Sequence, residues 1–109
     1  MSIPHAFPGI ATDLQPRDEI LSEAETFALV KTDEFEAVRM AVCKGYEACH
    51  DHHVPGPITV QCIQGCIALT ADGETHLLKT GQWTFLPGGV SHTIKGVDDS
   101  LVLLTVMYR

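Results

Sequence analysis

The feature that most constrains the fold of this chain is a succession of short apolar segments separated by turn residues. Most segments are rich in β-branched and aromatic residues, which favour strands, and turn signals recur about every ten residues. Asp72-Gly73 between two apolar runs is a strong signal for a hairpin. The predicted strands lie within 27–29, 35–42, 58–63, 66–70, 76–78, 82–86, 91–94 and 101–108. The pattern predicts an all-β protein, either a sandwich or a small barrel, with about eight strands in two antiparallel sheets.

The length of 109 residues is sufficient for one domain, and a hydrophobic content of 45% is sufficient for an ordinary core. Prolines are frequent in the first sixteen positions, so residues 1–25 are predicted to form an N-terminal arm. Within it, 18–25 is compatible with a short helical turn. Residues 26–109 are predicted to form the barrel domain.

The charge and the N-terminal sequence argue against several classes of partner. The formal net charge is −7, whereas nucleic-acid binders need basic patches. No apolar run approaches the length that crosses a membrane, and the first residues lack the basic and apolar regions of a signal peptide. We therefore expect a cytoplasmic protein that binds neither nucleic acid nor membranes.

Histidines cluster immediately before one of the predicted strands. His50, His52 and His53 surround Asp51, and the apolar run 58–63 follows. Imidazole is a ligand for several transition metals, so the cluster indicates a metal site. A solvated loop that carries these side chains is the alternative.

The four cysteines are expected to be reduced, because the chain lacks a secretion signal. Cys43, Cys62 and Cys66 are interpreted as small apolar residues in the core. Cys49 neighbours His50, so a ligand or redox role is the alternative there to the favoured packing role.

The second half of the chain carries a motif of a known family. Gly81, Pro87, Gly89 and His92 have the spacing of the second cupin motif, and on this evidence the chain resembles a small single-domain cupin of the RmlC-like superfamily. The resemblance covers roughly 26–108. It implies a small cupin β-barrel, also described as a double-stranded β-helix or jelly roll.

The first cupin motif is matched less completely. Gly45 and Gly65 fit its two ends, but Ile58 stands where the family has a glutamate, and Gly96 stands where the second motif has an asparagine. Ile58 cannot bind a metal. Gln61 is an alternative neutral ligand, although strand alternation predicts that it points away from the face of Ile58.

The interior of the first motif fits the sequence in two ways. One register places Asp51 and His53 at the ligand positions and, with His92, gives a set of two histidines and a carboxylate. The other register places His50 and His52 there and gives a set of three histidines. In either case the resemblance implies one divalent transition metal ion, such as Fe, Ni, Zn or Mn.

Two functions are compatible with these features. The first is a metal-dependent enzyme, oxygenase-like or isomerase-like, that acts on a small organic molecule inside the barrel. The second is a non-catalytic cupin that binds or senses a small ligand and has lost full metal ligation. A homodimer is also expected, because 101–107 is apolar on both faces and the arm carries Ile3, Phe7 and Ile10.

Overall fold

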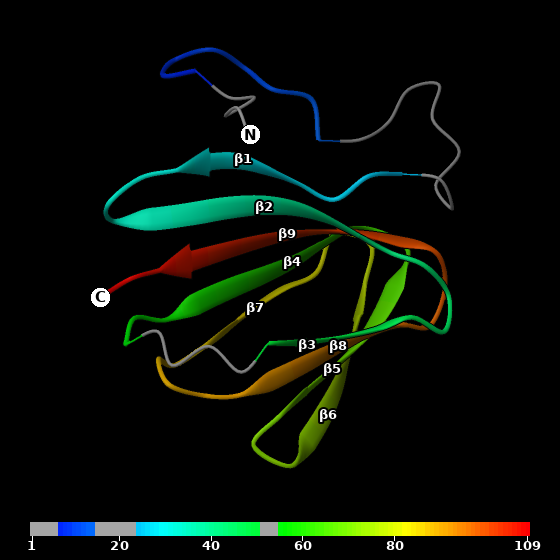
Figure 1. The fold of residues 1–109 in the computed structure, drawn as a ribbon. Coiled ribbons are helices and arrows are strands. Elements are labelled where there is room, and N and C mark those ends of the chain that lie inside the picture. Colours follow the sequence, from blue (N-terminus) through cyan, green and yellow to red (C-terminus); the bar gives the residue numbers. More distant parts are fainter. Residues whose placement is uncertain (1–6, 15–23, 51–54) are drawn as a thin grey trace.

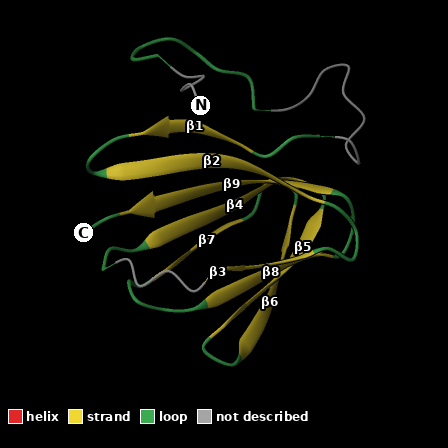
Figure 2. Cartoon of the chain, viewed as in Figure 1, coloured by secondary structure: helices red, strands yellow, loops and turns green. Residues whose placement is uncertain are grey.

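The computed structural model describes residues 7–14, 24–50 and 55–109, and these residues form two antiparallel sheets that face each other (Figure 1). The first sheet has the strand order β1-β2-β9-β4-β7 and the second has the order β3-β8-β5-β6. Figure 2 shows strands and loops but no helix in the described part of the chain. The strands are β1 (Phe27–Lys31), β2 (Phe35–Val42), β3 (Glu47–His50), β4 (Ile58–Gln64), β5 (Cys66–Ala71), β6 (Glu74–Lys79), β7 (Trp83–Leu86), β8 (His92–Gly96) and β9 (Ser100–Met107).

The prediction of an all-β fold with two antiparallel sheets is confirmed. The number of strands was underestimated, because the described residues contain nine strands and the additional one is β3. The possible helical turn within 18–25 falls largely on residues 15–23, which lie outside the described part, and Ala24 and Glu25 are irregular. The described residues include no helix that is long and apolar enough to cross a membrane.

Strand β9 lies at the centre of the five-stranded sheet. It pairs with β2 along its whole length, from Phe35 opposite Met107 to Val42 opposite Ser100, and it pairs with β4 on its other side. Successive side chains of a strand alternate between faces, so Val102 and Leu104 point toward the second sheet. The second sheet covers the inner face of β9. This explains why the residues of β9 that point inward are apolar.

The core lies between the two sheets. Val42, Val60 and Val102 from the first sheet belong to one buried cluster with Ile67 and Ile94 from the second. Removing each of these side chains from water stabilises the fold by roughly 1.5–3 kcal/mol. The packing of these two inner faces holds the sheets together.

A buried serine connects the two sheets where β5 and β9 begin. The Ser100 hydroxyl accepts a hydrogen bond from the Cys66 amide at 3.0 Å and lies 2.8 Å from the Asp98 carbonyl oxygen, to which it donates. Ser100 is 1% exposed, so unpaired polar atoms would be costly there. These hydrogen bonds fix the start of β9 against the start of β5.

The predicted hairpin at Asp72-Gly73 is confirmed. Ala71 pairs with Glu74 across the turn, and both central residues have positive φ, 53° for Asp72 and 79° for Gly73. Two consecutive positive φ values are characteristic of the tight two-residue turn that matches strand twist. The turn therefore sets the register of β5 against β6.

We predict that Gly73→Val destabilises the protein by about 1 kcal/mol or more, because a β-branched residue is strained at positive φ. No atom lies within 4 Å of the position a β-carbon would take, so the cost is one of backbone conformation. Thermal and chemical unfolding measure the change. The control is Gly73→Asn, since asparagine tolerates this conformation. An unfolding midpoint for Gly73→Val equal to that of the wild type would contradict the prediction.

Candidate functional site

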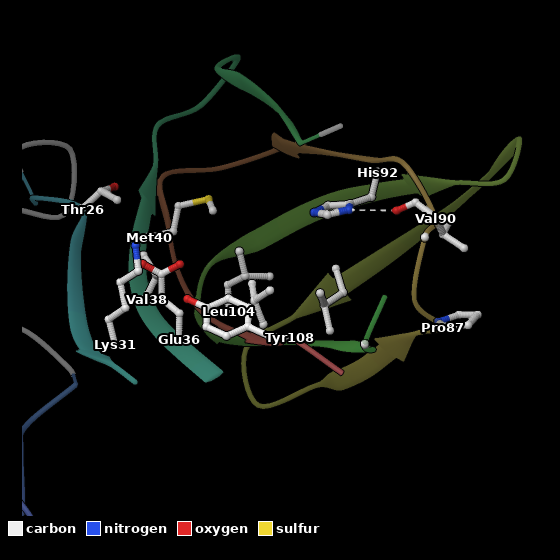
Figure 3. A pocket seen from close by; sticks show the side chains of 14 residues that line it. Thr26, Lys31, Glu36, Val38, Met40, Pro87, Val90, His92, Leu104 and Tyr108 are labelled. Atoms are coloured by element: carbon white, nitrogen blue, oxygen red, sulfur yellow. Dashed lines mark hydrogen bonds between the residues drawn. The ribbon is translucent and has the colours of Figure 1, made fainter. Parts of the chain in front are cut away.

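A cavity of about 300 Å³ lies between the two sheets (Figure 3). Strands β1, β2, β4 and β9 supply most of its wall, β8 supplies one histidine, and the turn after β7 closes one side. Its lining residues are Thr26, Lys31, Glu36, Val38, Met40, Gly56, Ile58, Pro87, Gly89, Val90, His92, Leu104, Val106 and Tyr108. Small-molecule sites are concave and mostly apolar, so this cavity is the candidate ligand site.

His92 is the buried titratable side chain on the cavity wall. It is the first residue of β8, is 6% exposed and points into the cavity (Figure 3). Its Nδ1 lies 3.4 Å from the carbonyl oxygen of Val90. A carbonyl can only accept, so a hydrogen bond there needs the proton on Nδ1 and makes Nε2 the nitrogen with the lone pair. That tautomer and fixed ring are what a metal-binding histidine requires.

The register of β3 and β8 places position 50 directly opposite His92. Ala48 pairs with Ile94, and His50 pairs with His92. Cross-strand partners share one face of a sheet, and Ala48 and Ile94 both contact the core. Position 50 is therefore the residue of β3 that lies beside His92 in the sheet. The side chain of His50 and all of Asp51, His52 and His53 lie outside the described residues, so the choice between the two motif registers stays a prediction.

The alternative ligand Gln61 is not brought together with His92. Ile58, Val60 and Cys62 of β4 are buried between the sheets, and Gln61 alternates to the other face, opposite Trp83 and Leu103. Ile58 lines the cavity and is 7% exposed, so an apolar side chain stands in the wall where the cupin motif has its glutamate.

Within the described ranges, no group of three or more His, Cys, Asp or Glu side chains could hold a metal ion. The ligands that the sequence predicts beside His92, at 50–53, are among the residues whose side chains lie outside the described part. The donor type fits, because imidazole is a ligand for transition metals and His92 lies on the cavity wall, paired across the sheet with a second histidine.

The cysteines have different environments. Burial, with a smaller contribution from the nearby Cys66, raises the pKa of the Cys62 thiol to about 11, so Cys62 remains protonated at neutral pH. The packing role is confirmed for Cys62, and Cys66 is half-buried. The predicted packing role is wrong for Cys43, which is exposed because it lies in the turn after β2. The side chain of Cys49 lies outside the part of the chain that the structure describes.

Sequence reasoning did not identify the polar residues at the end of the cavity away from His92. Lys31 and Glu36 are cross-strand partners on β1 and β2, and Tyr108 follows β9. Figure 3 shows these three side chains across the cavity from His92. Nothing in the local sequence distinguishes Lys31 and Glu36 from surface charges.

Two glycines allow backbone segments to meet beside the cavity. A β-carbon on Gly88 would overlap the carbonyl group of Pro55, and one on Gly56 would overlap the backbone of Met107 and lie 2.7 Å from the amide of Arg109. The Met107 amide donates to the Pro57 carbonyl at 3.0 Å. The segment 55–57, which begins two residues after His53, is thus held between the turn after β7 and the end of β9.

Comparison with known proteins supports the fold. No family model and no curated protein matches the chain. A conserved protein of unknown function from Streptococcus pyogenes is 23% identical, with a TM-score of 0.78, and the match covers 100% of this chain and 96% of that one. A cupin superfamily protein from Desulfitobacterium hafniense is 17% identical, with a TM-score of 0.72 and coverage of 92% and 100%. KdgF from Halomonas sp. is 22% identical, with a TM-score of 0.68 and coverage of 77% and 79%. These likenesses concern the fold.

Proposed function

This chain has the small cupin barrel fold, and we propose that it binds a small organic molecule between its sheets, beside a divalent transition metal ion held by His92 and the histidine cluster. The observation that carries the proposal is His92 itself. A histidine that is 6% exposed, lies on a cavity wall and has its Nδ1 beside a carbonyl is placed for a ligand rather than for solvent.

The pairing of β3 with β8 supports the three-histidine register. Ala48 contacts the core, and His50 is paired with His92 across the two strands. In the three-histidine register, positions 50 and 52 are two residues apart, which is the spacing at which strand side chains share a face. The proposed ligands are therefore His50, His52 and His92. Such a site accepts Fe, Ni, Zn or Mn, and the bound ion would supply a Lewis acid or a redox centre.

A second function is favoured by Ile58. Its alkyl side chain lines the cavity where the cupin motif places a carboxylate ligand. A cavity with this wall can retain a small molecule without any metal, as in a non-catalytic binding or sensor protein. This candidate shares the cavity with the first one and differs in the role of His92.

Metal analysis separates the two functions. The protein is purified without a histidine tag, stripped with a chelator and incubated separately with Fe(II), Ni(II), Zn(II) and Mn(II). Elemental analysis after desalting is expected to give one ion per chain for at least one of them. No retained metal under any of the four conditions would overturn the first function in favour of the second.

We further propose that two copies of the chain form a dimer through the outer face of the five-stranded sheet. Apolar side chains are exposed on this outer face and on the N-terminal arm. Trp83 and Phe85 on β7 are each 57% exposed with ring centroids 5.9 Å apart, and Phe7 and Ile10 of the arm are 65% and 67% exposed. Trp83 and Phe85 pair with the outer-face positions of β4. A two-fold axis would place this patch against itself.

Light scattering with size-exclusion chromatography is expected to give the mass of a dimer at micromolar concentration. Phe85→Ser should shift the mass toward the monomer, because it removes apolar contact area, whereas Leu77→Ser on β6 should not. Leu77 is the matched control because it is equally exposed, at 57%. A truncated chain that starts at Asp18 tests the arm. A monomeric mass for the full chain would end the dimer proposal.

A further inference from the structure

The wall of the cavity between His92 and the far polar group is formed by alkyl side chains. Val38 and Met40 come from β2, Ile58 from β4, and Leu104 and Val106 from β9. Each occupies an inward position of its strand, so their side chains face a shared space. The middle part of a bound molecule would contact these alkyl side chains.

Polar groups are found at opposite ends of this wall. His92 is at one end, and Lys31, Glu36 and Tyr108 are at the other (Figure 3). Lys31 and Glu36 are cross-strand partners of opposite charge, so together they add no net charge to their end of the cavity. A ligand with many hydroxyl groups would bury them against the alkyl wall without hydrogen-bond partners. That burial would reduce the binding free energy.

We propose that the ligand is a compact monocarboxylic acid with a branched aliphatic or aromatic body. This inference rests on the proposed function, because the carboxylate is directed at His92 and the metal beside it. The proposed metal cation favours an anionic oxygen. The body lies against Val38, Met40, Ile58, Leu104 and Val106. The cavity volume of about 300 Å³ is at the small end for ligand sites and limits the body to a single ring or a short branched chain.

Ile58 gives the cavity this preference. The alkyl wall extends through it, without the carboxylate that the cupin motif places there. A carboxylate at this position would need a cation or hydrogen-bond donors around it and would repel the head of an acid. The apolar body of the ligand therefore has continuous hydrocarbon contact from the first sheet.

Isothermal titration calorimetry on the metal-loaded full chain tests the ligand class. The probes are 3-phenylpropionate and 4-methylpentanoate, with gluconate as a polar acid and 3-phenylpropionamide as a neutral analogue. We expect the two apolar acids to bind about ten-fold more tightly than gluconate, and 3-phenylpropionate more tightly than its amide. Equal or stronger binding of gluconate would overturn the proposal, and so would the absence of binding by both apolar acids.

Two matched variants locate the binding. Val38→Thr introduces a hydroxyl into the wall of the cavity with little change in shape, and it should weaken 3-phenylpropionate binding several-fold. Val97→Thr makes the same exchange at a valine that is 41% exposed and lies outside the cavity lining, and it should have no effect. Equal affinities for the two variants would show that the probe binds elsewhere. The unfolding midpoint of each variant verifies that it is folded.

The metal-stripped protein distinguishes this inference from the proposed function. If the apolar acids bind with the same affinity after the metal is removed, the carboxylate is not directed at the metal and this inference is overturned, while a retained metal still supports the proposed function. If the protein retains a metal but binds only gluconate, the proposed metal site is supported and the ligand class is wrong.

Discussion

Replacing His92 with alanine is expected to weaken metal binding about ten-fold or more, whereas replacing His76 with alanine is expected to leave it unchanged. His92 is buried on the cavity wall and lies opposite position 50. His76 lies on β6 with its side chain 68% exposed, 3.5 Å from a carboxylate oxygen of Glu74. Each variant thus removes one imidazole, from the proposed site in one case and from the surface in the other.

Competition with a chromophoric chelator gives the affinity of each variant for Zn(II). The unfolding midpoint of His92→Ala is measured in parallel, because the substitution leaves a space in a buried position. His50→Ala is expected to show a loss similar to that of His92→Ala, since the two positions are cross-strand partners. Equal affinities for His92→Ala and His76→Ala would show that the site has been misplaced.

Much of the fold could be predicted from local sequence. The alternation in 35–42 corresponds to β2, and Asp72-Gly73 corresponds to the turn between β5 and β6. These signals are local, because side-chain period and turn conformation depend on neighbouring residues. His92 was identified in the same way, through the spacing of the motif that ends with it. The structure places it on the cavity wall.

The parts that could not be predicted depend on pairing between distant segments. Strand β3 consists of Glu47, Ala48, Cys49 and His50, which contain no β-branched residue, and it exists through its pairing with β8. The cross-strand relation of His50 to His92 was therefore hidden from the sequence. Lys31 and Glu36 reach the cavity through the register of β1 on β2, which includes a shift between Ala28 and Val30. Such a shift has no clear local signal.

We expect Gly88→Ala to have the second large effect, because its β-carbon would collide with backbone atoms. Gly88 lies in the turn between β7 and β8, and the added carbon would overlap the carbonyl group of Pro55 and lie 2.9 Å from the carbonyl oxygen of Gly56. Backbone atoms cannot rotate away as a flexible side chain would. Either the turn or the segment 55–57 must move, at a cost of about 1–3 kcal/mol in the free energy of unfolding.

The position of this collision links stability to the proposed site. His92 begins the strand that follows the turn, and the segment 55–57 begins two residues after His53. Displacing the turn from the segment 55–57 should separate His92 from the proposed ligands at 50 and 52. Metal affinity should therefore fall together with the unfolding midpoint. The control is Gly89→Asn, one residue further on. Gly89 has a φ of 79° and nothing within 4 Å of its β-carbon position, and asparagine tolerates that conformation. Gly89→Asn should therefore keep wild-type metal affinity. If Gly88→Ala matched the control in both measurements, the close approach of Gly88 to Pro55 would have no part in the proposed metal site.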